Sequence, residues 1–129
     1  MTHSNEETIR AAYAAFVQGD LNGYLKYCTD NITFSVPGKG KISGTHKRNE
    51  FISPWVSGVI ELTNGTFRET VNDVVANDHR GVVLATHEFE RNNQKFKYDT
   101  AHIYTIKDGK LDSFHEYPAD LYYFDEAWS

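Results

Sequence analysis

Two short turn signals lie between long alternating runs of apolar and polar residues in the second half of the chain. Asn92-Asn93 separates residues 81–91 from residues 94–106, and Asp108-Gly109 lies between that second run and residues 110–117. Asn, Asp and Gly tolerate the positive φ angles that two-residue hairpin turns require. Because alternation is typical of a strand with one buried face, the pattern predicts a long antiparallel meander.

Helical patterns dominate the first half of the chain. Ser4 followed by Glu7 is typical of a capping box, and apolar residues then recur at helical spacing until Gly19. A second helix is predicted over residues 20–30, capped by Asp20, and Cys28 is its buried small apolar residue.

The remaining elements complete an α+β layout. Residues 31–36 alternate as a strand, and residues 48–61 predict a third helix that Pro54 disturbs. A long strand is predicted over residues 63–77. Residues 119–128 form a short last helix, either a lid over a cavity or a segment that seals a dimer. Helices first and strands after favour helices packed on one face of a curved antiparallel sheet.

Size and charge limit the classes of function. The chain has 129 residues and a mass of 14.7 kDa, which predicts one domain spanning residues 1–129. Its formal net charge is −5 and Lys and Arg form no basic stripe, so we expect no nucleic-acid partner. Aromatic residues make up 14% of the chain, enough to line an apolar pocket or an interface as well as a core.

Location is predicted from what the sequence lacks. No run of about 18 apolar residues occurs, and the polar start of the chain has no apolar signal-peptide region. We therefore expect no membrane partner and a cytoplasmic location. The single cysteine excludes an internal disulfide and a multi-cysteine zinc site.

Several stretches together give the chain a family resemblance. They are AAFVQGDLNGYL, ITFSVPG, ISGTHKRNEF, TAHIYTIKDGKL and FHEYPAD. In order and spacing they resemble the nuclear transport factor 2-like superfamily, and within it the SnoaL-like and ketosteroid-isomerase-like proteins. The resemblance implies a cone, in which a curved sheet wrapped by three helices encloses an apolar pocket, usually in a homodimer. Members include isomerases, dehydratases, polyketide cyclases, epoxide hydrolases and scaffolds, so the fold leaves the function open.

The catalytic residues of the ketosteroid isomerases are missing from the matching positions. Val36 occupies the place of the general-base aspartate, and Ala101 occupies that of the protonated aspartic acid. Ala12 stands where the oxyanion-hole tyrosine is expected, with Tyr13 one residue away. Steroid isomerisation by that mechanism is therefore not expected.

The SnoaL-like cyclases match better. The resemblance implies a histidine on the third long strand and a carboxylate on the last, and His102 and Glu116 occupy those places, with Glu replacing Asp. Whether His102 and Glu116 lie opposite each other depends on the turn of the last hairpin. A strict two-residue turn would place residue 102 opposite His115, whereas a bulge at Gly109 would place it opposite Glu116. The alternative is a pair on the rim or at an interface.

If Arg91 pairs with Gln94 across the Asn92-Asn93 turn, the two flanking strands share a face that carries bulky aromatic side chains and two imidazoles. Such a face is either a pocket wall or a dimer surface. His87 on that face is a second acid–base candidate. The candidate pocket residues are Tyr13, Phe16, Phe34, His46, Trp55, Tyr98, Tyr104 and Phe114. Two histidines and a glutamate also suggest a metal triad, but no H-x-H or H-E-x-x-H spacing supports one, so no metal and no cofactor are predicted.

These observations predict an acid–base enzyme for a lipophilic or ring-containing small molecule, of isomerase, cyclase or dehydratase type. Glu116 and His102 would exchange the proton, and His87 or Tyr13 would polarise an oxygen. Two alternatives remain open: a ligand-binding protein without turnover, and a dimeric scaffold whose sheet is the working surface.

Overall fold

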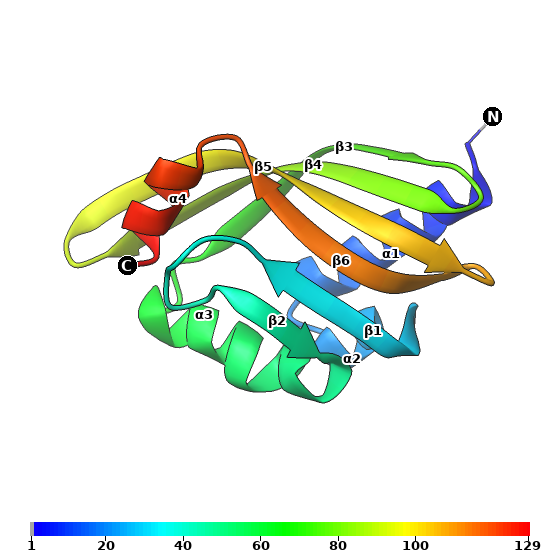
Figure 1. Ribbon diagram of the computed structural model, residues 1–129, viewed down its shortest axis with the longest axis horizontal. Helices are drawn as coiled ribbons and strands as arrows, with labels where there is room; N and C mark the ends of the chain where they lie inside the picture. The colour runs from blue at the N-terminus through cyan, green and yellow to red at the C-terminus, as the bar shows by residue number, and fades with distance from the viewer. Residues whose placement is uncertain (1) are drawn as a thin grey trace.

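A six-stranded sheet forms the body of the protein in the computed structural model, which describes residues 2–129 (Figure 1). The strand order is β2-β1-β6-β5-β4-β3, with β1 parallel to β6 and the other neighbours antiparallel. The strands are β1 (Cys28–Val36), β2 (Gly44–Lys47), β3 (Arg68–Ala76), β4 (Arg80–Arg91), β5 (Gln94–Lys107) and β6 (Lys110–Pro118). The helices are α1 (Ser4–Val17), α2 (Leu21–Leu25), α3 (Ser57–Leu62) and α4 (Leu121–Ala127).

The sheet curves around helices α1, α2 and α3, and α4 lies at one end of it (Figure 1). Buried side chains form two apolar clusters, one between the sheet and the first two helices and one beneath α4. Phe34, Tyr104 and Leu111 are fully buried in the first cluster, and each such side chain contributes about 1.5–3 kcal/mol to folding. The predicted α+β cone is confirmed.

Both hairpins have two-residue turns. Arg91 pairs with Gln94, as the sequence predicts, so the inward face of β4 and β5 carries His87 and His102. In the second hairpin Lys107 pairs with Lys110.

The pairing of β5 with β6 shifts by one residue beyond this second turn. Thr105 pairs with Ser113 while Ile106 pairs with Leu111, so Asp112 is an extra residue on β6. The bulge therefore lies at Asp112 and not at Gly109, and it places His102 opposite Glu116.

The first two helices differ from the prediction at their ends. His3 and not Ser4 caps α1, because the His3 ring accepts the backbone N–H of Asn5 at 3.0 Å. The second helix ends at Leu25, and Cys28 is a buried residue at the start of β1.

The predicted third helix is divided into three short segments. Residues Arg48–Glu50 form a 3-10 turn, Phe51–Val56 a π-helical segment, and α3 follows. Ser53 has extended backbone angles because a proline ring disfavours helical angles at the residue before it, here Pro54.

Helix α4 packs its second half against the sheet. Asp120 caps it, as predicted, by accepting the Tyr123 N–H at 3.2 Å. The side chain of Trp128 is fully buried and stacks on Phe89, with ring centroids 4.3 Å apart. The Arg91 guanidinium donates to the carbonyl of Ala127 at 2.6 Å and so fixes the end of the helix.

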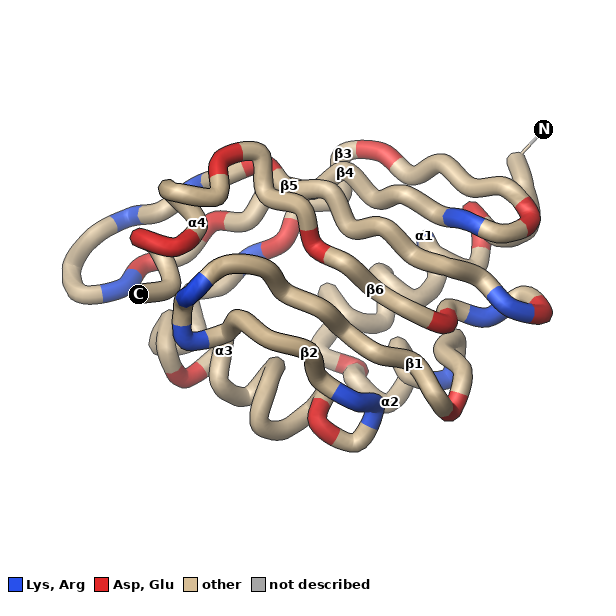
Figure 2. The backbone as a smooth tube through the Cα atoms, viewed as in Figure 1, with Lys and Arg blue, Asp and Glu red and all other residues tan. Residues whose placement is uncertain are grey.

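Lys and Arg are dispersed over turns and strand ends, and no continuous basic stripe runs along residues 2–129 (Figure 2). Among those residues, no helix is both long and apolar enough to cross a membrane.

The thiol of Cys28 is expected to be unreactive in the folded protein. Burial raises its pKa to about 12, so the reactive thiolate fraction at pH 8 is on the order of 10⁻⁴. Iodoacetamide at pH 8 should leave the native protein unlabelled and add one label in urea, as read by mass spectrometry. Rapid labelling of the native protein would contradict the burial of this side chain.

Candidate functional site

Four ionisable side chains from four adjacent strands meet on the inner face of the sheet. They are Glu69 on β3, His87 on β4, His102 on β5 and Glu116 on β6, and we call them the polar floor. Glu69 lies opposite His87 in the β3–β4 ladder, and His102 lies opposite Glu116 in the β5–β6 ladder. Because directly opposed residues project to the same side, the sheet itself brings the four together.

Glu69 and His87 form the closest pair of the polar floor. The Glu69 Oε2 atom lies 2.5 Å from His87 Nε2, and both side chains are 6% exposed. Burial alone would raise the pKa of Glu69, but the hydrogen bond and charge of His87 outweigh it, and the pKa lies below its usual value. Burial alone would lower the pKa of His87, but Glu69 raises it above its usual value. Both shifts favour the imidazolium–carboxylate form of this buried pair.

Glu116 is a second buried carboxylate. Its Oε2 atom accepts a hydrogen bond from the Thr100 hydroxyl at 3.0 Å and lies 3.5 Å from His102 Nε2. The same oxygen lies 3.7 Å from His87 Nδ1. Burial would raise the pKa of Glu116, but the two imidazoles and the Thr100 hydroxyl hold it below its usual value. Glu116 is therefore ionised at neutral pH and able to accept a proton.

His102 is oriented by a chain of tyrosine hydroxyls. Its Nδ1 atom lies 2.7 Å from the Tyr13 hydroxyl, which lies 2.6 Å from that of Tyr104. Tyr24 continues the chain at 2.7 Å from Tyr104. Burial raises the pKa of all three phenols, so they remain protonated. The His102 Nε2 atom is buried without a hydrogen-bond partner among residues 2–129, which leaves it free for a bound molecule.

The polar floor forms one side of a cavity of about 340 Å³. The other walls are mostly apolar and aromatic, and Phe16, Trp55 and Phe114 are among them. Val17 and Ile60 also line the cavity, and they are 62% and 51% exposed. The mouth therefore lies between the end of α1 and α3.

Most of the predicted site residues lie together in this cavity. The predicted catalytic residues Glu116, His102 and His87 all line it, as do six of the predicted pocket residues, namely Tyr13, Phe16, Trp55, Tyr98, Tyr104 and Phe114. Phe34 and His46 do not line it, contrary to the prediction. Phe34 is fully buried in the core, and His46 stacks on Trp55, with ring centroids 5.4 Å apart.

Glu69 is the residue of the polar floor that the sequence analysis missed. Val71 pairs with Ala85 and Asp73 with Leu84, so Asn72 forms a bulge in β3. The bulge interrupts the alternation that would have assigned Glu69 to the inner face. The available signal was the apolar spacing of Phe67 and Val71 around Glu69, which places all three on one side of a strand.

Trp128 closes the cavity at the end where α4 lies. Its indole Nε1–H donates to the Tyr98 hydroxyl at 2.9 Å, and that hydroxyl lies 3.1 Å from His87 Nδ1. The last helix therefore contributes a cavity wall through Trp128 and also holds the tyrosine that contacts the polar floor.

Comparisons with known proteins agree with this architecture. An uncharacterized protein of Mycobacterium tuberculosis is 23% identical over 125 residues, which cover 95% of each chain. Among solved structures, Bal32a from a soil-derived mobile gene cassette is 29% identical with a TM-score of 0.89, over 98% of this chain and 97% of that one. TerC, co-crystallized with polyporic acid, is 26% identical with a TM-score of 0.82, over 96% and 97% of the two chains.

An NTF2-like protein from Burkholderia xenovorans, 21% identical with a TM-score of 0.78, covers 100% of this chain and 98% of its own and shares the fold. The family model of the SnoaL-like domain matches residues 9–114, which include most of the sheet and three of the four residues of the polar floor, namely Glu69, His87 and His102. The chain therefore belongs to the SnoaL-like family and shares the fold of the NTF2-like protein.

Proposed function

We propose that the protein is an acid–base enzyme that acts on a lipophilic, ring-containing small molecule with a carbonyl or hydroxyl oxygen. The observation that carries the proposal is the position of His102 Nε2, 3.5 Å from Glu116 Oε2 at the wall of an aromatic cavity. A molecule bound in this cavity would meet a proton acceptor and an imidazole at the same point. Isomerisation, aldol-type cyclisation and dehydration can each use that arrangement for proton transfer.

Each member of the polar floor has a role in the proposal. Glu116 removes a proton from the carbon next to the substrate oxygen and passes it to His102, 3.5 Å away, which returns it at the second position. His87, whose two ring nitrogens contact Glu69 and Tyr98, polarises the oxygen on which negative charge develops. Tyr13 orients His102 and is the alternative donor to that oxygen.

The two other candidate functions differ in what they require of the cavity. A scaffold that uses only its outer surface has no need of an open interior, and the 340 Å³ cavity argues against it. A binding protein without turnover needs the cavity but not the adjacency of His102 and Glu116. Turnover is therefore the measurement that separates the enzyme from a binding protein.

We expect cyclic ketones, phenols and quinones to quench the fluorescence of Trp55 and Trp128, both of which line the cavity. Polyporic acid belongs in the panel because it was co-crystallized with the related TerC. Compounds that bind are then incubated with the protein, and products are sought by chromatography and mass spectrometry. Product formation supports the enzyme, and binding without product supports the binding protein.

Two variants test whether binding occurs in this cavity. Ile60→Arg places a charge at the mouth and should weaken binding of an apolar ligand about tenfold or more. Leu121→Arg is the matched control, because Leu121 is similarly exposed (45% against 51% for Ile60) but lies on α4 outside the lining. Equal weakening by both variants, or by neither, would place the ligand elsewhere.

A further inference from the structure

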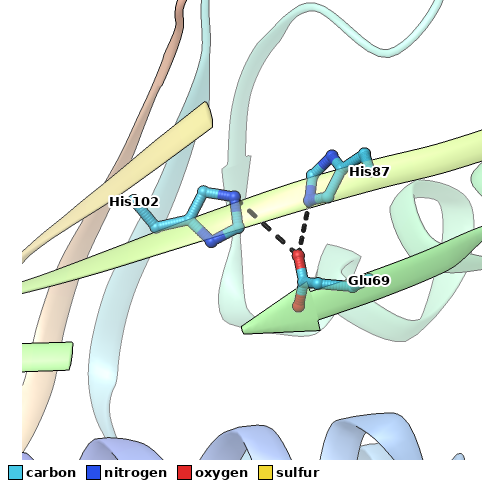
Figure 3. A group of neighbouring side chains, drawn as sticks. All are labelled: Glu69, His87 and His102. Carbon is cyan, nitrogen blue, oxygen red and sulfur yellow. Dashed lines mark hydrogen bonds and ion pairs between the residues drawn. The ribbon is translucent and has the colours of Figure 1, made fainter. Parts of the chain in front are cut away.

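We propose that Glu69, His87 and His102 form a binding site for a divalent first-row transition-metal ion such as Zn²⁺. Each residue offers one ligand atom, and the three atoms all lie within 4.8 Å of one another (Figure 3). Two imidazoles and one carboxylate are a ligand set that suits zinc and iron(II), and such sites leave open positions for water or substrate. The inference concerns binding and does not rest on the proposed reaction.

Adjustment of the side chains would bring the ligand atoms to the spacing that an ion requires. Ligand atoms about 2.0–2.2 Å from a central metal are separated from one another by roughly 3–3.5 Å. Glu69 Oε2 lies 2.5 Å from His87 Nε2 and 3.9 Å from His102 Nε2. A small rotation of the Glu69 side chain would make these two distances more equal, while the histidines stay on their strands.

Each histidine is held by its other ring nitrogen, as is usual for metal ligands. The His102 Nδ1 atom contacts the Tyr13 hydroxyl at 2.7 Å, and the His87 Nδ1 atom contacts the Tyr98 hydroxyl at 3.1 Å. Figure 3 shows the Glu69 carboxylate between the two rings, with ion-pair lines to both. The two Nε2 atoms are therefore the ones that would face a metal, and its binding would displace the proton between His87 Nε2 and Glu69.

Two independent observations favour the binding of a cation at this place. The His102 Nε2 atom is buried and has no hydrogen-bond partner in the described part of the chain. In addition, the polar floor contains two carboxylates, Glu69 and Glu116, whose side chains are 6% and 4% exposed. Once a bound dication has displaced the proton of His87, its two positive charges balance both carboxylates.

Glu116 remains free in this arrangement. Its Oε2 atom lies 3.5 Å from the proposed ligand atom of His102, and it is held by Thr100. With His87 and His102 as its ligands, a bound ion would replace them in polarising a substrate oxygen, and Glu116 would remain available as the proton acceptor.

The test is direct titration of the chelator-treated full chain with Zn²⁺ by calorimetry, and with Co²⁺ by visible absorption. We expect one ion per chain. Glu69→Gln, His87→Gln and His102→Gln should each weaken binding about 100-fold, and Tyr13→Phe about tenfold. His115→Ala is the matched control, because His115 is an exposed histidine next to Glu116 on the same strand, and it should bind as the parent does.

The outcomes separate this proposal from the proposed reaction. Glu116→Gln should keep metal binding within about tenfold, since it alters a neighbour and not a ligand. Circular dichroism on every variant shows that lost binding is not lost folding. The proposal is overturned if the parent binds no ion above the chelator background, or if folded variants of all three ligands bind as tightly as the parent. Surface binding is identified if only His115→Ala weakens it.

Discussion

Replacement of Glu116 by glutamine is expected to lower turnover by about 100- to 10,000-fold while leaving the fold and ligand uptake nearly intact. The amide keeps the size of the carboxyl group, and its oxygen can still accept the Thr100 hydroxyl that now lies 3.0 Å from Glu116. An amide cannot take up a proton, so the variant loses the acceptor and little else. The measurement is kcat/KM on a substrate found with the ligand panel.

The control for this variant is Glu88→Gln on β4. Glu88 is exposed and points away from the cavity, so the same chemical change there should leave kcat/KM unaltered. Ligand affinity, followed by tryptophan fluorescence, should be similar in both variants. If Glu116→Gln turns substrate over within threefold of the parent, Glu116 is not the proton acceptor.

Trp128→Ala is expected to reduce the free energy of unfolding by about 3–5 kcal/mol, among the largest effects of any single substitution. The indole is fully buried, stacks on Phe89 and donates to the Tyr98 hydroxyl. Its removal leaves a void beneath α4 that joins the existing cavity. Equilibrium unfolding in urea, monitored by circular dichroism, gives the change.

Two further variants show which part of Trp128 matters. Trp128→Phe keeps a stacked ring but loses the hydrogen bond to Tyr98, so it should recover most of the stability. Tyr122→Ala removes an aromatic ring from the same helix, but that ring is 91% exposed, and the change should be within about 0.5 kcal/mol. A loss below 1 kcal/mol for Trp128→Ala would mean that α4 does not close the cavity.

Local patterns in the sequence were sufficient to predict the inner face of the first hairpin. Asn92 and Asn93 both have positive φ angles, which a two-residue turn requires, and this fixes the pairing of β4 with β5. Once that pairing is fixed, His87 and His102 must face the same side. A short-range signal therefore located half of the polar floor.

The rest of the polar floor lies on strands with irregularities, which weaken the signal of the local patterns. Glu69 faces inward on a strand whose alternation is broken at Asn72, and Glu116 faces His102 because of the bulge at Asp112. Both bulges are stabilised by contacts with other strands, and in the first the Asn72 side-chain amide donates to the Thr86 hydroxyl of β4 at 2.9 Å. The Asp112 carboxylate accepts the Thr29 hydroxyl from β1 at 2.6 Å, a contact that depends on tertiary structure.

The bulge at Asp112 also determines where β6 can tolerate a change of length during evolution. Asp112 is unpaired, so its loss would straighten β6 and still leave Glu116 opposite His102. Loss of one residue between Ser113 and His115, with the bulge retained, would instead bring Tyr117 opposite His102. A deletion at Asp112 is therefore expected to preserve the site. A deletion between Asp112 and Glu116 instead replaces the carboxylate of the cavity with the phenol of Tyr117.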